Sequence, residues 1–252
     1  MSTAHARRVL LAPGYILHHR PYRDTSRILE VLVRDHGRLT LFARGVRGPK
    51  PRFGGVLQPF DLLLLSFQVG REAGQLTGAE SAQSAPPLPA GSLMAGFYLN
   101  ELLLKLTARH DPMIEVFEDY GRALAGLRGG GRVEAVLRVF EKRLLEAVGY
   151  GVDLTSEART GRAIEAERFY RLRASEGLVP AVEGDADAVA GSSILALARE
   201  DMGKPGQGRV EERVLEDARK VLKAALAERL EGKELTTRRV ARAVASRGGS
   251  RT

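Results

Sequence analysis

Two hydrophobic patterns divide the chain near residue 85. Between residues 12 and 80, short runs of apolar and β-branched residues alternate with turn signals; from residue 92 onward, apolar positions recur every three or four residues. The first pattern predicts β-strands and the second predicts helices. Pro86, Pro87 and Pro89 fall between them. We therefore predict two domains, residues 1–82 and residues 83–252.

The first region contains five strand candidates and one long loop. Asp35-His36-Gly37 is a hairpin signal between the second and third strands, and the Gly- and Pro-rich stretch 45–55 predicts a loop after the third. Five short strands within roughly 70 residues fit a small closed or nearly closed barrel. The candidates are Tyr15–His19, Ile28–Arg34, Leu39–Val46, Phe60–Val69 and Gly74–Glu80.

The second region predicts a helical bundle with a small insert. Its first helix is apolar almost all round, which is typical of a buried central helix. Residues 152–185 lose the helical period, and Arg168–Arg173 with Gly177–Ala181 predict a small hairpin or irregular insert. The fold class is therefore α+β, multidomain. The expected helices are Ser92–Thr107, Met113–Leu127, Val133–Val148, Ser192–Arg199, Val210–Leu230 and Glu234–Ala245.

Composition excludes several classes of chemistry. The chain has no Cys, which excludes disulfides, thiol catalysis and thiolate-bound zinc. Its longest apolar runs are far shorter than the roughly 20 residues of a membrane span. The apolar run 9–12 after Arg7 and Arg8 is too short for a signal peptide. We expect a cytoplasmic protein without a membrane partner.

No motif of an enzyme or cofactor site is present. The chain lacks a phosphate-binding G-x-x-x-x-G-K-[ST] sequence, and the glycines of 126–131 lie between two helices rather than after a strand. His18 and His19 are neighbours on a predicted strand, so they point to opposite faces and cannot share a metal. We expect no enzyme activity, cofactor, metal or small-molecule substrate. A hydrolase in the helical domain has no residue constellation to support it.

Charge is concentrated at the two ends of the chain. The net charge of +8 divides into +6 for residues 1–80 (12 basic, 6 acidic), −3 for 81–234 (22 and 25) and +5 for 235–252 (5 and 0). Arg38, Arg44, Arg47, Lys50 and Arg52 fall within fifteen residues without an acid, interleaved with two Phe. Cations that follow phosphates and aromatic faces that stack on bases are typical of single-strand binding. We predict single-stranded nucleic-acid binding there; the alternative is a solubilising loop.

Several short motifs occur together in a particular order. They are Tyr15-Ile16-Leu17-His18, Tyr22-Arg23-Asp24-Thr25-Ser26, Gly37-Arg38-Leu39, Ala43-Arg44-Gly45-Val46-Arg47, Leu57-Gln58-Pro59-Phe60, Tyr98-Leu99-Asn100-Glu101-Leu102-Leu103, Leu137-Arg138-Val139-Phe140-Glu141, Gly149-Tyr150-Gly151-Val152, Tyr170-Arg171-Leu172-Arg173 and Gly232-Lys233-Glu234-Leu235 with Arg238. Through them the chain resembles the RecO family of bacterial recombination mediators over nearly its whole length.

The resemblance implies an N-terminal OB-fold barrel and a role in DNA repair and recombination. Such proteins bind single-stranded and duplex DNA and anneal complementary strands coated by single-strand-binding protein. With RecR they help to load RecA, in a pathway that includes RecF; this places them in the cytoplasm with the nucleoid. Arg44 matches a basic position of the family's DNA surface. Arg138 matches an Arg implicated in gripping the acidic, apolar C-terminal tail of single-strand-binding protein, unless it is an ordinary exposed helix Arg.

One departure from the family concerns residues 152–185. Many relatives carry a four-Cys zinc module here, but this chain has no Cys, so the insert is expected to be held by packing alone or to be mobile. The alternative to a DNA-repair function comes from another functional class: an RNA-binding or translation adaptor that uses the barrel.

Overall fold

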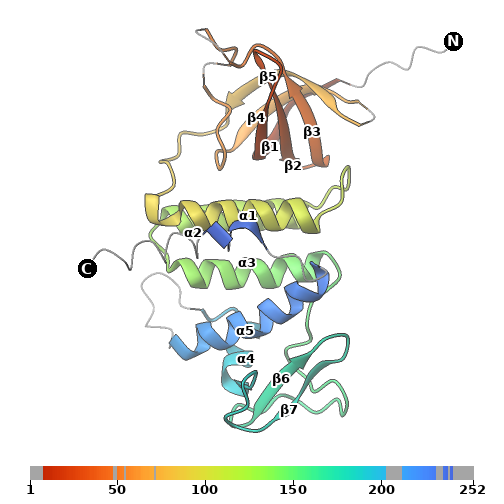
Figure 1. Ribbon diagram of the computed structural model, residues 1–252, viewed down its shortest axis with the longest axis vertical. Coiled ribbons are helices and arrows are strands. Elements are labelled where there is room, and N and C mark those ends of the chain that lie inside the picture. The colour runs from red at the N-terminus through yellow and green to blue at the C-terminus, as the bar shows by residue number, and fades with distance from the viewer. Residues whose placement is uncertain are drawn as a thin grey trace, which may run out of the picture. The chain divides into compact units, whose positions relative to one another are not determined.

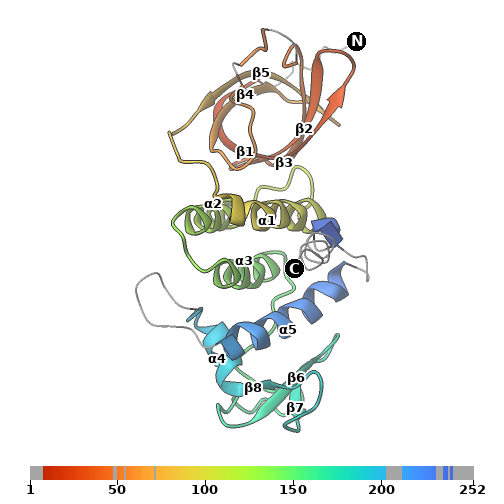
Figure 2. The same cartoon turned by 60° about the vertical axis from the view of Figure 1, so that its left-hand side comes forward.

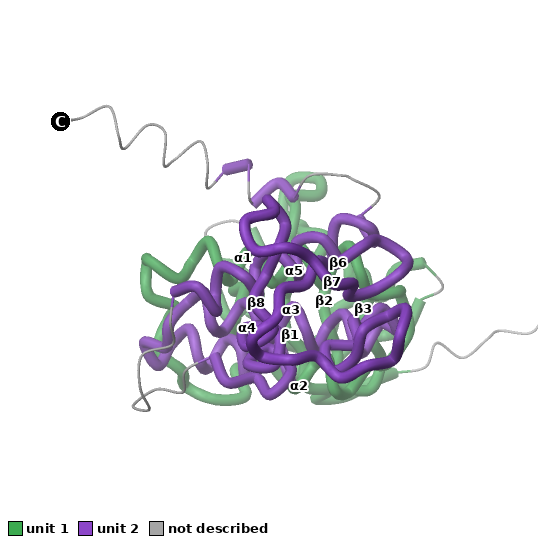
Figure 3. Tube along the Cα trace, turned by 90° about the horizontal axis from the view of Figure 1, so that it is seen from below, with its two compact units in different colours: residues 1–118 green, residues 119–252 purple. Residues whose placement is uncertain are grey.

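The computed structural model describes residues 8–47, 50–53, 55–70, 72–202, 212–230, 235–237 and 239–240. The chain divides into two units, residues 1–118 and 119–252 (Figure 3). Packing thus extends the first unit past the 82/83 boundary predicted from sequence. Within the residues described, no helix combines the length and apolar composition that a membrane span requires.

Five strands close into a barrel, as the sequence predicts. They are β1 (Arg8–Tyr22), β2 (Ser26–Val33), β3 (Gly37–Ala43), β4 (Leu63–Gln68) and β5 (Gly74–Ser81). Their order around the barrel is β1-β2-β3-β5-β4, and β4 pairs with β1 to complete the ring (Figures 1 and 2). Only the short β3–β5 pairing is parallel. The closed ring with a helical region after it is the architecture of an OB-like barrel protein.

Period-2 alternation on β3 explains which side chains fill the barrel. Leu39, Leu41 and Ala43 are buried, whereas the residues between them are half-buried. The hairpin from β2 to β3 ends at Gly37, whose φ is +68°. A Cβ there would lie 2.2 Å from the carbonyl oxygen of Asp111, so the close approach of this backbone also requires glycine.

The structure extends β1 well beyond its predicted beginning. The strand starts at Arg8 and has a bulge between Val9 and Ala12 in its pairing with β4. At the bulge Leu11 adopts a φ of +49°, and both Leu10 and Leu11 are exposed. Two adjacent outward leucines break the alternation, which is why sequence periodicity missed this half of the strand.

Helix α1 (Leu93–Leu106), which follows a short 3-10 turn at Ala90–Ser92, packs on the barrel within the first unit. The buried side chain of Asn100 donates a hydrogen bond of 2.8 Å to the carbonyl of Leu17 on β1. A Cβ on Gly96 would lie 2.9 Å from the ring of Phe60, so glycine allows this close packing. The apolar helix predicted from sequence is therefore buried against the strands.

The second unit is built from helices. It contains most of α2 (Ile114–Arg128), together with α3 (Val133–Ala147), α4 (Gly191–Ala198) and α5 (Glu212–Arg229). The expected ends agree within two residues, and Gly149, with a φ of +82°, terminates α3 as predicted. Of the final expected helix, 234–245, residues 235–237 and 239–240 are described, and residues 236, 237, 239 and 240 are helical; the rest lies outside the described residues.

The insert in the second unit contains a small sheet. Strands β6 (Phe169–Arg173) and β7 (Gly177–Ala181) form the predicted hairpin, and the short strand β8 (Val189–Ala190) pairs with β6. The β8 strand was not predicted, because a two-residue strand leaves no periodic pattern in the sequence.

Candidate nucleic-acid interface

Two basic segments lie side by side on the barrel: the β1–β2 hairpin tip and the loop that follows β3. The backbone amides of Val46 and Arg47 both donate to the carbonyl of Thr25, at 2.8 and 3.0 Å. The Arg47 guanidinium also donates to the carbonyl of Arg23 at 3.3 Å. Sequence positions 20–27, 44–47 and 50–53 therefore form one surface, which we call the basic rim.

The basic rim carries seven cations and one carboxylate, that of Asp24. All but one of the cations are on exposed residues, and Arg27 is half-buried. Among the described residues, none of the seven forms an ion pair. Such uncompensated like charge is repulsive, and an anionic partner would relieve the repulsion. The cations are Arg20, Arg23, Arg27, Arg44, Arg47, Lys50 and Arg52.

Aromatic rings lie among these cations. Tyr22 and Phe42 have ring centroids 5.3 Å apart, and the Arg23 guanidinium carbon lies 5.2 Å from the centroid of Tyr22. In the loop, the Arg52 guanidinium carbon lies 4.9 Å from the centroid of Phe53. Tyr22 is exposed. An exposed ring with guanidinium planes beside it can stack on the bases of a single strand.

The structure adds three arginines to the predicted set. Arg44, Arg47, Lys50 and Arg52 lie together in the exposed loop, as their spacing suggested. Arg20, Arg23 and Arg27 were missed because the hairpin tip is about twenty residues away in sequence. The sequence of the tip itself has three arginines around one Tyr with a single acid, which indicates a basic surface only weakly.

Arg38 is not part of the basic rim. It lies near the start of β3, about 16 Å of strand away from the loop that follows Ala43. Its guanidinium donates to the carboxylate of Glu30 at 3.3 Å and to the carbonyl of Thr107 at 2.9 Å. Its side chain is only 12% exposed. Arg38 thus lies apart from the loop cations with which the sequence grouped it, and its contact with DNA stays a prediction.

Glu30 is the centre of the polar cluster that holds Arg38. Its carboxylate also accepts hydrogen bonds from Thr40 at 2.8 Å and from Arg109 at 3.0 Å. Burial lowers the pKa of Arg38, while the carboxylate of Glu30 opposes this shift. The cluster connects β2 and β3 to the end of α1 and gives Arg38 a structural role.

The second unit contains a groove of about 420 Å³ between α2 and α3. We call it the α2–α3 groove. A Cβ on Gly126 would lie 3.0 Å from Val136, so glycine lets the two helices approach closely. Apolar side chains form most of its wall, and three arginines border it. The lining residues are Asp119, Arg122, Ala123, Gly126, Gly131, Arg132, Ala135, Val136, Val139, Phe140, Arg143, Glu200 and Met202.

The arginines of the α2–α3 groove differ in their partners. Arg143 donates to Asp119 at 2.6 Å and to Glu200, and these hydrogen bonds raise its pKa. Arg122 also contacts Asp119 at 2.6 Å, whereas Arg132 has longer contacts with Glu134 and Glu212. Arg122 and Arg132 keep 57% and 42% of their side chains exposed. They are the cations of this groove that an anion can reach.

Arg138 lies on α3 but not in the α2–α3 groove. It is two residues from both Val136 and Phe140, which places it on the opposite face of the helix. Its side chain is 8% exposed and lies 2.8 Å from the carboxylate of Glu141, which is fully buried. Arg138 is thus not the ordinary exposed helix Arg of the alternative interpretation, and its burial leaves little surface for a peptide; its contact with the tail stays a prediction.

The cysteine-free insert is fastened by polar contacts as well as by packing. Asp153 accepts hydrogen bonds from the side chains of Ser156 and Thr155, which lower its pKa to about 2. Ser175 donates to Glu228 of α5 at 2.7 Å. The expectation of packing alone is therefore wrong.

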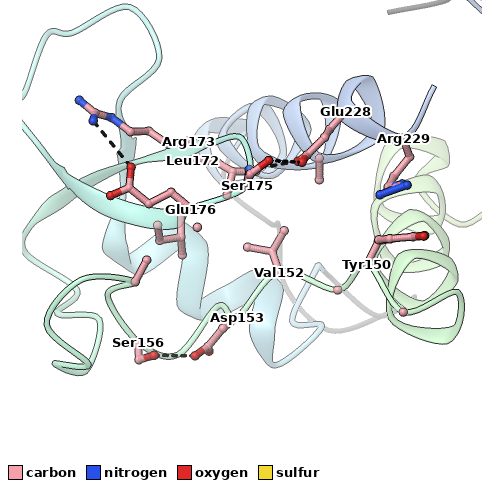
Figure 4. Close-up of a pocket in the computed structure, with 16 residues that line it drawn as sticks. Tyr150, Val152, Asp153, Ser156, Leu172, Arg173, Ser175, Glu176, Glu228 and Arg229 are labelled. Carbon is pink, nitrogen blue, oxygen red and sulfur yellow. Dashed lines mark hydrogen bonds and ion pairs between the residues drawn. The ribbon is translucent and has the colours of Figure 1, made fainter. Parts of the chain in front are cut away.

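A hollow of about 370 Å³ remains beside the insert (Figure 4). The Arg229 guanidinium lies over the ring of Tyr150, 3.3 Å from its centroid. The carboxylates of Asp153, Glu176 and Glu228 at the hollow all accept hydrogen bonds or form ion pairs within the chain. The contact of Glu228 with Ser175 attaches the insert to α5, whereas those of Asp153 and Glu176 lie within the insert. No group of three or more His, Cys, Asp or Glu suited to a metal occurs among the described residues.

The strand order and the helical region after it define an OB-like barrel protein of the α+β class. Sequence profiles for the N- and C-terminal regions of recombination protein O match residues 8–85 and 91–239. The chain belongs to the RecO family of DNA repair proteins, and its role lies in DNA repair and recombination.

Curated relatives are similar over most of the chain. The DNA repair protein RecO of Methylococcus capsulatus is 42% identical over 235 residues, which cover 93% of this chain and 94% of the relative. That of Nitrosococcus oceani is 39% identical over 233 residues, or 92% of each chain. That of Chromobacterium violaceum is 42% identical over 204 residues, which cover 79% and 83%.

Proposed function

We propose that the basic rim binds single-stranded DNA and that the protein uses it to anneal complementary strands coated by single-strand-binding protein. The observation that carries this proposal is the cluster of seven cations without an ion-pair partner in the described structure, with the exposed ring of Tyr22 among them. Neutralising phosphates on two strands removes the repulsion that opposes pairing. The same cations also suit duplex DNA, because they recognise phosphate rather than base sequence.

The α2–α3 groove is the proposed site for the tail of single-strand-binding protein. A tail with carboxylates and a terminal Phe needs cations beside an apolar recess. Arg122 and Arg132 offer the cations, while Val136, Val139 and Phe140 offer the recess. The buried Arg138 does neither. Two sites on one protein would raise its local concentration on coated DNA.

The rest of the proposal follows the family. The protein acts without catalysis or cofactor, in the cytoplasm with the nucleoid, and assists RecA loading together with RecR and RecF. The alternative is an RNA-binding adaptor that uses the same barrel. Competition between DNA and RNA of equal length for the basic rim distinguishes these functions, and tighter binding of RNA would favour the adaptor.

Salt dependence tests the basic rim. Seven phosphate contacts would give a slope of log K against log salt of about −5, from about −0.7 per contact. Arg44→Glu with Arg47→Glu should lower affinity for labelled oligo-dT, make the slope shallower and slow the annealing of coated strands. Arg162→Glu, at an exposed position in the insert, is the matched control. Undiminished binding and annealing by the double variant would contradict the proposal.

Fluorescence binding of a labelled tail peptide tests the groove. Arg122→Glu with Arg132→Glu should weaken binding at least tenfold, and a peptide without its terminal Phe should also bind weakly. Arg162→Glu again serves as the control. An unchanged affinity in the double variant would reject the α2–α3 groove as the tail site.

A further inference from the structure

Residues 200–202 lie just beyond the last turn of α4 and contribute to the α2–α3 groove. Glu200 and Met202 both line it. Between them, Asp201 is exposed. The segment therefore contains two carboxylates followed by an apolar side chain, which is the same chemical order as an acidic tail with a hydrophobic end.

Glu200 binds one cation of the groove, Arg143, and its neighbour Lys142. It accepts hydrogen bonds from the Nε of Arg143 at 2.9 Å and from Lys142 at 3.1 Å. Its φ is +56°, a left-handed conformation that residues other than glycine rarely adopt. The contacts with Arg143 and Lys142 hold the residue in this conformation.

Met202 occupies the apolar end of the same groove. Its residue is only 2% exposed, so the thioether side chain is packed rather than solvated. Methionine is unbranched and flexible, and it fills irregular spaces without a strict shape requirement. Another apolar side chain of similar volume could take its place.

We propose that residues 200–202 are an internal surrogate for the partner's tail, and that a tail binds by displacing them. This inference rests on the proposed function of the α2–α3 groove. In the free protein, Glu200 takes the position of a tail carboxylate on Arg143 and Met202 takes the position of the tail's apolar side chain. The affinity measured for a tail is then its intrinsic affinity reduced by the competition from this segment.

Charge balance favours displacement over simple addition. Arg143 already contacts two carboxylates, those of Asp119 and Glu200. A tail carboxylate added to this pair would place three negative groups around one guanidinium, and the repulsion between them would weaken binding. If Glu200 leaves as the tail arrives, the count of carboxylates at Arg143 stays at two.

The direction of change in affinity tests the surrogate. Glu200→Gln removes one partly exposed ion pair and should tighten binding of a labelled acidic peptide ending in Phe by about three- to fivefold. Asp201→Asn removes the same charge from an exposed neighbour and is the matched control. Met202→Ala should also tighten binding, because it removes the side chain that competes with the peptide's Phe. A Met202 that only lined the site would instead lose contacts with the peptide on truncation, so weaker or unchanged binding by Met202→Ala would overturn the surrogate, as would unchanged binding by Glu200→Gln.

A second measurement uses the unaltered protein, so it does not depend on a variant that folds. With methyl-labelled methionine, the resonance of Met202 should move towards that of a solvated methionine as peptide is added. Met94 and Met113, outside the second unit, are internal controls. A Met202 methyl that stays packed at saturation would overturn displacement. Absence of peptide binding to the wild type would instead reject the proposed function of the groove.

Discussion

Arg138 and Glu141, one turn apart on α3, form an ion pair of 2.8 Å whose two side chains are 8% and 0% exposed. Removal of one member of a buried ion pair takes an opposite charge away from the other, which is unfavourable by about 3 to 5 kcal/mol. We therefore expect Arg138→Ala to lower the free energy of unfolding by about this amount, measured by urea denaturation.

The companion variant separates structure from partner binding. Arg138→Met combined with Glu141→Leu removes both charges and should recover most of the stability. Its affinity for the tail peptide should equal that of the wild type. A stable Arg138 variant that has lost peptide binding would show that this residue, and not the α2–α3 groove, grips the tail.

Arg38 and Arg44 should respond in opposite ways to truncation. Arg38→Ala removes charged hydrogen bonds to Glu30 and Thr107 and should destabilise the protein by about 2 kcal/mol. Its slope of DNA affinity against salt should not change. Arg44→Ala should leave the urea midpoint in place and weaken DNA binding. A shallower salt slope for Arg38→Ala would show that this residue contacts DNA phosphate after all.

Tyr22 should contribute stacking rather than charge. We expect Tyr22→Ala to weaken binding of single-stranded DNA by about 1 to 3 kcal/mol without a change in the salt slope. Tyr22→Phe keeps the ring and should bind almost as the wild type does. Equal binding by the Ala and Phe variants, measured with the same oligonucleotide, would exclude a stacked base at this position.

Asp153 should make the insert sensitive to strong acid. Its pKa is lowered to about 2 from an ordinary value of 3.8, chiefly by the hydrogen bond from Ser156. Because the folded pKa is the lower one, the stabilisation is fully present above about pH 4 and is lost as the pH falls through 2.

NMR titration of the Asp153 carboxyl resonance checks this expectation. The midpoint should lie near 2 in the wild type and should move towards 3.8 in Ser156→Ala. Asp153→Asn should remove the acid-dependent change in the amide resonance of Thr155, which donates to the same carboxylate. A wild-type midpoint near 3.8 would show that these hydrogen bonds do not persist in solution.

Local patterns were sufficient for most of the secondary structure. Alternation on Leu39, Leu41 and Ala43 and the turn at Gly37 predict the β2–β3 hairpin, because strand geometry repeats every two residues. The predicted ends of α1 to α4 are correct within two residues. The bulge at Leu11 was missed, since it replaces the alternation with two adjacent exposed leucines.

The candidate site was only partly predictable. Consecutive cations such as Arg44 and Arg47 share a loop, so sequence proximity was enough to group them. Arg23 joins them through hydrogen bonds to a segment about twenty residues away, which no local pattern indicates. Arg38 is closer in sequence to Arg44 than Arg52 is, but the length of β3 separates it from the loop.

By itself, the sequence determined the barrel, the helices, the absence of thiolate chemistry and the basic loop, because each depends on residue type and short-range spacing. Only the tertiary structure decided which cations are available to a partner. Burial and a carboxylate neighbour fix Arg38 and Arg138 in place, whereas exposure without an ion-pair partner in the described chain leaves Arg44 and Arg47 accessible. A charged residue has the same identity in either setting, and its role depends on the groups that folding brings to it from distant parts of the chain.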